Sequence, residues 1–134
     1  MAPHTAVLTG NAPKPIPQLS QAVKYNGMVY CSGSLGVDPK TRQFVEGSVK
    51  DRTRQALKNL TAVLAAAGSS IENVVKVNVF LTDMSNFAAM NEVYDEFFVS
   101  EPRPCRTCVA VHQLPMNSDV EIELTAFESA KARL

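Results

Sequence analysis

Residues 103–124, RPCRTCVAVHQLPMNSDVEIEL, constrain the fold more than any other stretch of the chain. Apolar residues alternate with others on both sides of a proline-containing loop, and this period of two predicts two half-buried strands. The apolar positions are Val109, Val111, Val120, Ile122 and Leu124. We expect them to face the core, so that an arginine and two carboxylates, Arg106, Glu121 and Glu123, line the opposite face.

A hairpin and a long helix are predicted upstream of this stretch. Asn26-Gly27 suits the type I′ turn of a hairpin, because both central residues of that turn need a positive φ. Ser48 and Asp51 form a capping-box pattern at the start of a helix, and Gly68 stands where its C-cap is expected. The apolar stripe of this helix is Val49, Ala56, Leu57, Leu60, Val63, Leu64 and Ala67.

A further strand and a second helix follow. Residues 71–83 predict a strand with one apolar face, formed by Val75, Val77, Val79 and Leu81. We expect Ser85 to cap the second helix and Glu101-Pro102 to end it. Its stripe is Phe87, Met90, Tyr94, Phe97 and Phe98. With a short strand in residues 5–10, the predicted order is β-β-β-α-β-α-β-β.

The chain is expected to form a single domain over residues 1–134, with a proline-rich extended arm at 1–18 and a polar tail at 128–134. Two helices cover one face of such a sheet, which predicts an α+β fold with a mixed sheet and one open face, with parallel pairing across the strand-helix-strand segments. We expect Arg106, Cys108 and Glu121 on the open face. One interpretation of that face is a symmetric subunit interface with clefts. The alternative interpretation is a plain solvent-exposed face on which arginine and glutamate side chains form an ionic ladder.

The balance of charges and the spacing of the cysteines indicate which kinds of partner and ligand the chain is expected to bind. Thirteen basic residues balance thirteen acidic ones, and a net charge of zero disfavours a nucleic-acid or anionic-membrane partner. No apolar run approaches a membrane span, and the first 20 residues lack a signal or transit pattern, so we expect a cytoplasmic protein. Cys105 and Cys108 have C-x-x-C spacing, but without a second pair the pattern favours reduced thiols over a metal or redox site.

Three stretches carry a resemblance to a known family: SQAVKYNGMVYCSG, residues 53–98, and RTCVAV…LP…VEIE. The chain resembles the Rid family of reactive intermediate deaminases, also called the YjgF family, over about Asn11 to Phe127. The resemblance implies a chorismate-mutase-like sandwich with two helices on one face, assembled as a homotrimer with a site in each cleft between subunits. It also implies hydrolysis of enamines and imines, such as 2-aminoacrylate and 2-iminobutanoate, to 2-keto acids and ammonia, without a cofactor or metal.

The resemblance assigns roles to several residues. Arg106 matches the arginine that holds the substrate carboxylate, a task that a planar guanidinium performs with two parallel hydrogen bonds. Glu121 matches the glutamate that orients or deprotonates water. Gly33 and Cys108 match substrate-binding positions that contribute mainly through the backbone. Asn91 matches a position that supports the site, and a core amide that ties the helix to a strand or loop is favoured over direct ligand contact.

The chain departs from the family pattern at the pocket wall. Leu19 stands where the family commonly has a tyrosine that helps to close the pocket, and Ser34 stands where many relatives have glutamine. Three functions therefore stay open: an enamine/imine deaminase, a non-catalytic trimer that binds a small carboxylate or a protein partner, and a ribonuclease. The third is disfavoured, because the only histidines are His4 and His112 and the chain has no basic excess.

Overall fold

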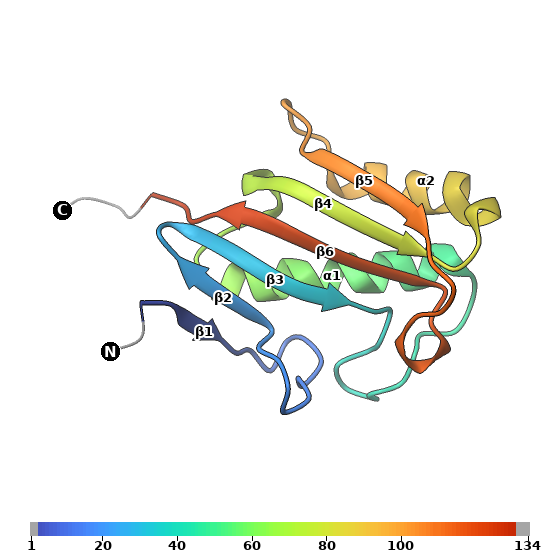
Figure 1. The fold of residues 1–134 in the computed structure, drawn as a ribbon, viewed down its shortest axis with the longest axis horizontal. Coiled ribbons are helices and arrows are strands. Elements are labelled where there is room, and N and C mark those ends of the chain that lie inside the picture. Colours follow the sequence, from blue (N-terminus) through green and yellow to red (C-terminus); the bar gives the residue numbers. More distant parts are fainter. Residues whose placement is uncertain (1–2, 131–134) are drawn as a thin grey trace.

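The computed structural model describes residues 3–130 and has one six-stranded sheet with two helices on one face (Figure 1). The elements are β1 (Thr5–Val7), β2 (Ala22–Tyr25), β3 (Met28–Ser34), α1 (Val49–Ala66), β4 (Val74–Leu81), α2 (Phe87–Phe97), β5 (Cys105–Ala110) and β6 (Val120–Phe127). The predicted element order and the mixed α+β class are confirmed.

The sheet has the order β1-β2-β3-β6-β4-β5, and every pair is antiparallel except β4 with β5. The parallel pairing predicted across the second helix is therefore confirmed. The one predicted across the first helix is wrong, because β6 inserts between β3 and β4. The last strand of the chain thus lies near the centre of the sheet (Figure 1).

The core lies between the sheet and the helices. In β6 the residues Val120, Ile122, Leu124 and Ala126 are each at most 3% exposed, and they pack with Leu57, Leu60 and Leu64 of α1 in one cluster. The intervening side chains of β6 point to the other face and are half-buried. The sheet therefore has one apolar face under the helices and one open face that is more polar.

The turn and the first helix follow the sequence pattern. Asn26 and Gly27 have φ values of 50° and 78°, which is the left-handed pair that the predicted hairpin turn requires. Ser48 Oγ accepts a hydrogen bond from Lys50 N, and Asp51 Oδ2 accepts one from Ser48 N at 2.9 Å. The predicted capping box is therefore formed at the start of α1.

The second helix begins differently from the prediction. Asp83, not Ser85, supplies the capping side chain: its Oδ1 accepts from Ser85 N at 2.8 Å and starts a 3-10 turn at Met84–Asn86 that leads into α2. The helix also ends at Phe97, four residues before Glu101.

The predicted inward faces of β4 and β5 are wrong at several residues. Val75 is 39% exposed rather than buried, because the register of β4 against β6 shifts between Val74 and Lys76 and Val74 takes the inward position. In β5, Arg106 and Cys108 lie on the helix-covered face and Val109 lies on the open face, 42% exposed. The reason is register: Arg106 pairs with buried Val77 of β4, and paired residues share a face of the sheet.

The capping hydrogen bonds at Ser48 and Asp83 predict different effects of two serine substitutions on stability. Ser48→Ala removes the acceptor of the capping box and should lower the free energy of unfolding by about 1 kcal/mol. Ser85→Ala is the matched control, because the Asp83 cap uses the backbone N–H of Ser85, which alanine keeps. Urea unfolding at one fixed protein concentration compares them. Equal losses from both variants would contradict the assignment of the caps.

Candidate functional site

The carboxylate of Glu121 lies across Gly33 on the open face. A Cβ atom built on Gly33 would come within 2.5 Å of Glu121 Oε2 and 2.8 Å of Cδ. The two residues are neighbours because β3 pairs with β6 and the register shifts between Cys31 and Ser34. Glycine at position 33 therefore leaves room for the glutamate side chain itself, and any larger residue would push the carboxylate aside.

Glu121 sits in an unfavourable environment for a charge. Partial burial raises the pKa of this carboxyl above its usual range, and the nearby charge of Glu123 raises it further. Glu123 accepts a hydrogen bond from Asn78 Nδ2 at 3.1 Å, whereas Glu121 accepts none from residues 3–130. A half-buried carboxylate that lacks a partner is suited to bind or move a proton.

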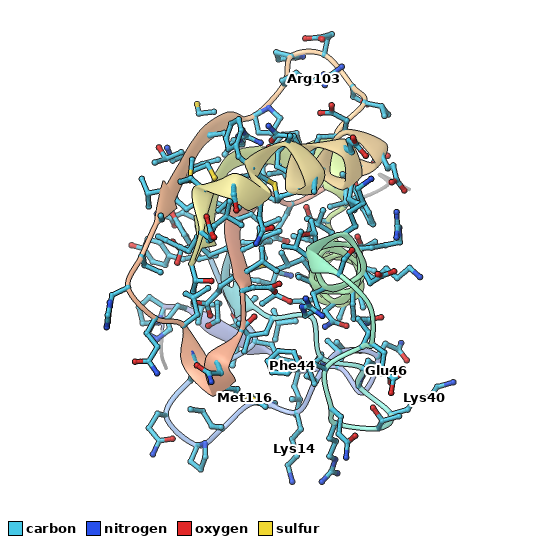
Figure 2. All side chains as sticks on the ribbon, turned by 90° about the vertical axis from the view of Figure 1, so that its right-hand side faces the viewer. Lys14, Lys40, Phe44, Glu46, Arg103 and Met116 are labelled. Carbon is cyan, nitrogen blue, oxygen red and sulfur yellow. The ribbon has the colours of Figure 1, made fainter. Side chains whose placement is uncertain are left out.

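A groove of about 580 Å³ opens in front of Glu121 and Gly33. Its wall is largely apolar and includes Leu19, which directly follows the N-terminal arm and is 44% exposed, and Met116 of the 3-10 turn before β6. Lys14, which also lines the groove, lies at the same end of the molecule as Met116 and far from Arg103 (Figure 2). The N-terminal arm and the loop before β6 therefore frame the groove together.

Most polar groups in the groove wall are already engaged by the fold. Gln21 Nε2 donates to Pro13 O at 3.0 Å, and Asn59 Nδ2 donates to Val37 O at 2.8 Å. Ser32 and Ser34 donate to backbone carbonyls. Glu121 is consequently the acidic group that the groove offers to a ligand.

Arg106 is held by one face of α2. Its Nη1 donates to Asn91 Oδ1 at 2.6 Å, and its Cζ lies 5.5 Å from the centre of the Phe87 ring and 4.7 Å from that of Tyr94. Asn91 thus ties α2 to β5, as the sequence favoured. The other N–H groups of Arg106 have no hydrogen-bond partner among residues 3–130 and are available to an anion.

Arg106 and Glu121 do not share a pocket within one chain. Glu121 pairs with Phe80 of β4, which in turn pairs with Val109 of β5, so β5 is two strands, about 10 Å, away from β6. The two side chains also point to opposite faces of the sheet. The prediction that both lie on the open face is therefore wrong, and the two side chains lie apart within one chain.

Cys105 and Cys108 lie on opposite faces of β5. Cys108 packs against the core on the helix-covered face, where burial raises the pKa of its thiol, while Cys105 is exposed on the other face. Cys31 is buried and the pKa of its thiol is raised to about 12. A protonated thiol is a poor nucleophile, which agrees with a packing role for buried Cys31 and half-buried Cys108.

The sequence pattern missed the aromatic contacts of Arg106. Helical spacing alone places Phe87 and Tyr94 on the core stripe of α2 and indicates no contact with Arg106. Their spacing from Asn91, four and three residues, puts all three on one helix face, and that face would have indicated a common partner.

A model of the family described as Endoribonuclease L-PSP matches residues 9–128. The chain belongs to this family, the YjgF/Rid family.

Individual relatives of the chain carry different names. A protein of Dermatophagoides farinae named 2-iminobutanoate/2-iminopropanoate deaminase is 43% identical over 123 residues, which is 92% of this chain and 95% of that protein. A Schizosaccharomyces pombe protein named mmf1, mitochondrial, is 48% identical over 112 residues, 81% of this chain and 67% of that one. The structure of E. coli TdcF with bound serine superposes with a TM-score of 0.87 at 38% identity, covering 93% of this chain and 99% of that chain.

The raised pKa of Glu121 predicts a pH dependence of stability. A folded-state pKa above the unfolded value of about 4.3 means that the folded protein binds more protons than the unfolded chain. The free energy of unfolding therefore falls as pH rises from the unfolded pKa through the folded pKa. Glu121→Gln should gain stability relative to wild type between pH 4 and pH 8, measured as the difference in thermal midpoint.

Asp83→Asn is the control of opposite sign for this measurement. The hydrogen bond from Ser85 N lowers the pKa of Asp83, so its stabilising contribution is lost as pH falls and the variant should approach wild type at low pH. A pH-independent midpoint difference for Glu121→Gln would contradict the environment described for this carboxyl.

Proposed function

We propose that the chain hydrolyses reactive enamines and imines of the 2-aminoacrylate and 2-iminobutanoate type to 2-keto acids and ammonia. The observation that carries the proposal is the Glu121 carboxylate, half-buried, without a hydrogen-bond partner among the described residues and with a raised pKa, set over Gly33 in a groove. The deaminase name of the mite relative supports this reaction, and the serine bound to E. coli TdcF supports a ligand with an α-carboxylate.

In this mechanism Glu121 handles water and protons. The enamine tautomerises to the imine, and Glu121 accepts a proton from the water molecule that attacks C2 of the imine. Glu121 then passes this proton to the imine nitrogen, so that a neutral carbinolamine forms and the carboxylate is regenerated. Collapse of the carbinolamine breaks the C–N bond, transfers the hydroxyl proton to the departing nitrogen and releases ammonia. A carboxyl pKa that is raised above its usual range suits such a base, because the basicity of the carboxylate increases. These steps need no cofactor or metal.

Arg106 is proposed to hold the substrate carboxylate. A guanidinium has five N–H donors, and the hydrogen bond to Asn91 uses one of them. The remaining donors allow a pair of parallel hydrogen bonds to a carboxylate, which is a geometry that an ammonium group does not offer. We also propose that the backbone near Cys108 and Gly33 contacts the ligand.

The pocket is proposed to form between subunits of a homotrimer with the chorismate-mutase-like arrangement of the family. Arg106 of one subunit would meet Glu121 of the next, because the two residues lie on opposite faces of the sheet in one chain. The half-covered sheet supports the assembly, since its open face carries exposed Val109 and Tyr30 beside half-buried polar groups.

Leu19 supports a second candidate function, a non-catalytic trimer that binds a small carboxylate or a protein partner. Its side chain lines the groove with Gly33 and Glu121, at the position where the resemblance to the family implies a tyrosine hydroxyl. In this case the anion site is kept and turnover is lost.

A cytoplasmic location is a separate proposal, and cell fractionation tests it. Within residues 3–130 no helix has the length and apolar character to cross a membrane.

A deaminase assay with enzymatically generated 2-aminoacrylate decides between the two functions. Wild type should release ammonia, and Glu121→Gln should lose about a hundred- to ten-thousandfold in rate while its affinity for 2-oxobutanoate changes far less. Arg106→Ala should abolish 2-oxobutanoate binding, and Arg106→Lys should restore it only in part. Unchanged rates in both variants would refute the proposed roles, and an inactive wild type that binds 2-oxobutanoate would favour the binding protein.

Glycine variants provide a matched pair for the same assay. Gly33→Ala should displace the Glu121 carboxylate and lower the rate, since the new methyl group would lie 2.5 Å from Oε2. Gly10→Ala places its methyl group where no atom lies within 4 Å and should leave the rate unchanged.

A further inference from the structure

Three side chains on one face of α2 lie against the guanidinium of Arg106. Phe87, Asn91 and Tyr94 occupy positions i, i+4 and i+7 of the helix, and each of them contacts Arg106. The two rings present their faces at 5.5 and 4.7 Å, within the distance at which a ring attracts a cation. The amide of Asn91 fixes one N–H direction between them.

Arg106 differs in its partners from three other arginines of the chain. Arg52, Arg54 and Arg103 each form an ion pair with a carboxylate, at 2.7, 2.9 and 3.2 Å. Arg106 has no carboxylate partner among residues 3–130. Aromatic rings restrain a cation without cancelling its charge, so the full positive charge remains available to an anionic ligand.

We infer that Phe87 and Tyr94 are positioning residues for Arg106, an inference that rests on the proposed function. The rings hold the guanidinium plane in place before the ligand arrives. The substrate carboxylate then meets prearranged donors, and little side-chain entropy is lost on binding. Phe87 is 37% exposed and Tyr94 is 6% exposed, so the first ring can be changed with little effect on the core.

The ring of Tyr94, rather than its hydroxyl group, supplies this contact. The hydroxyl oxygen is buried and has no hydrogen-bond partner among the described residues. Tyr94→Phe keeps the ring and removes an unpaired polar group. It should therefore retain the position of Arg106 without loss of stability.

Two measurements on wild type and Phe87→Leu test the inference. The first is the NMR shift of the Arg106 side-chain protons, which the adjacent ring displaces in the absence of any ligand. The second is calorimetric titration with 2-oxobutanoate, together with KM and kcat for imine hydrolysis. Phe87→Leu should lose the ring displacement and weaken 2-oxobutanoate binding by about two- to thirtyfold, with KM rising more than kcat falls.

Matched variants separate positioning from general damage to the helix. Phe97→Leu makes the same substitution on α2 at a half-buried ring that packs on the core. It should lower the thermal midpoint without changing the affinity. Phe87→Tyr should restore both the shift and the affinity. Equal affinities of Phe87→Leu and Phe97→Leu for 2-oxobutanoate would overturn the inference, as would unchanged Arg106 shifts in Phe87→Leu. If wild type fails to bind 2-oxobutanoate but shows shifts that Phe87→Leu removes, the proposed function fails and the positioning stands.

Discussion

The strict alternation of β6 governs the rest of the structure. Its inward residues are almost fully buried under the helices, and its outward residues include Glu121 and Glu123. Because β6 pairs with both β3 and β4, a slip of one residue would bring these carboxylates into the core and would break the contact between Glu121 and Gly33. The register of β6 therefore fixes both the packing of the core and the placement of the proposed base.

The proposed anion site depends on a different element. Arg106 lies on the edge strand β5 but is oriented by α2, through Asn91 and two aromatic rings. Its charge is left unpaired by the described residues, while the charge of Glu121 is destabilised by burial and by Glu123. Within residues 3–130 one chain thus has a cation and a carboxylate without ionic partners on opposite faces, and the proposed homotrimer would bring the two groups together.

The sequence predicted the elements better than their orientation. The capping box at Ser48, the turn at Asn26-Gly27 and the inward face of β6 follow from local chemistry and from neighbours that are fixed by burial. The alternation in β5 identified two faces correctly but could not say which one is covered. Val109 is as apolar as a core residue although it lies on the open face. The covered face of β5 is set by the pairing of Arg106 with Val77 and of Cys108 with Val79, and these partners are distant in sequence. The Asp83 cap was missed because Ser85, the other capping residue nearby, is part of the same turn.

The central claim is that Arg106 and Glu121 act together only across a subunit boundary, and mixed assemblies test it most directly. Arg106→Ala and Glu121→Gln subunits, each nearly inactive alone, would be denatured, mixed in equal amounts and refolded together. If each pocket takes its arginine from one subunit and its glutamate from the next, about one quarter of the pockets contain both residues, and about that share of the wild-type deaminase rate should return. No recovery in mixtures that have reassembled as trimers would contradict the shared pocket.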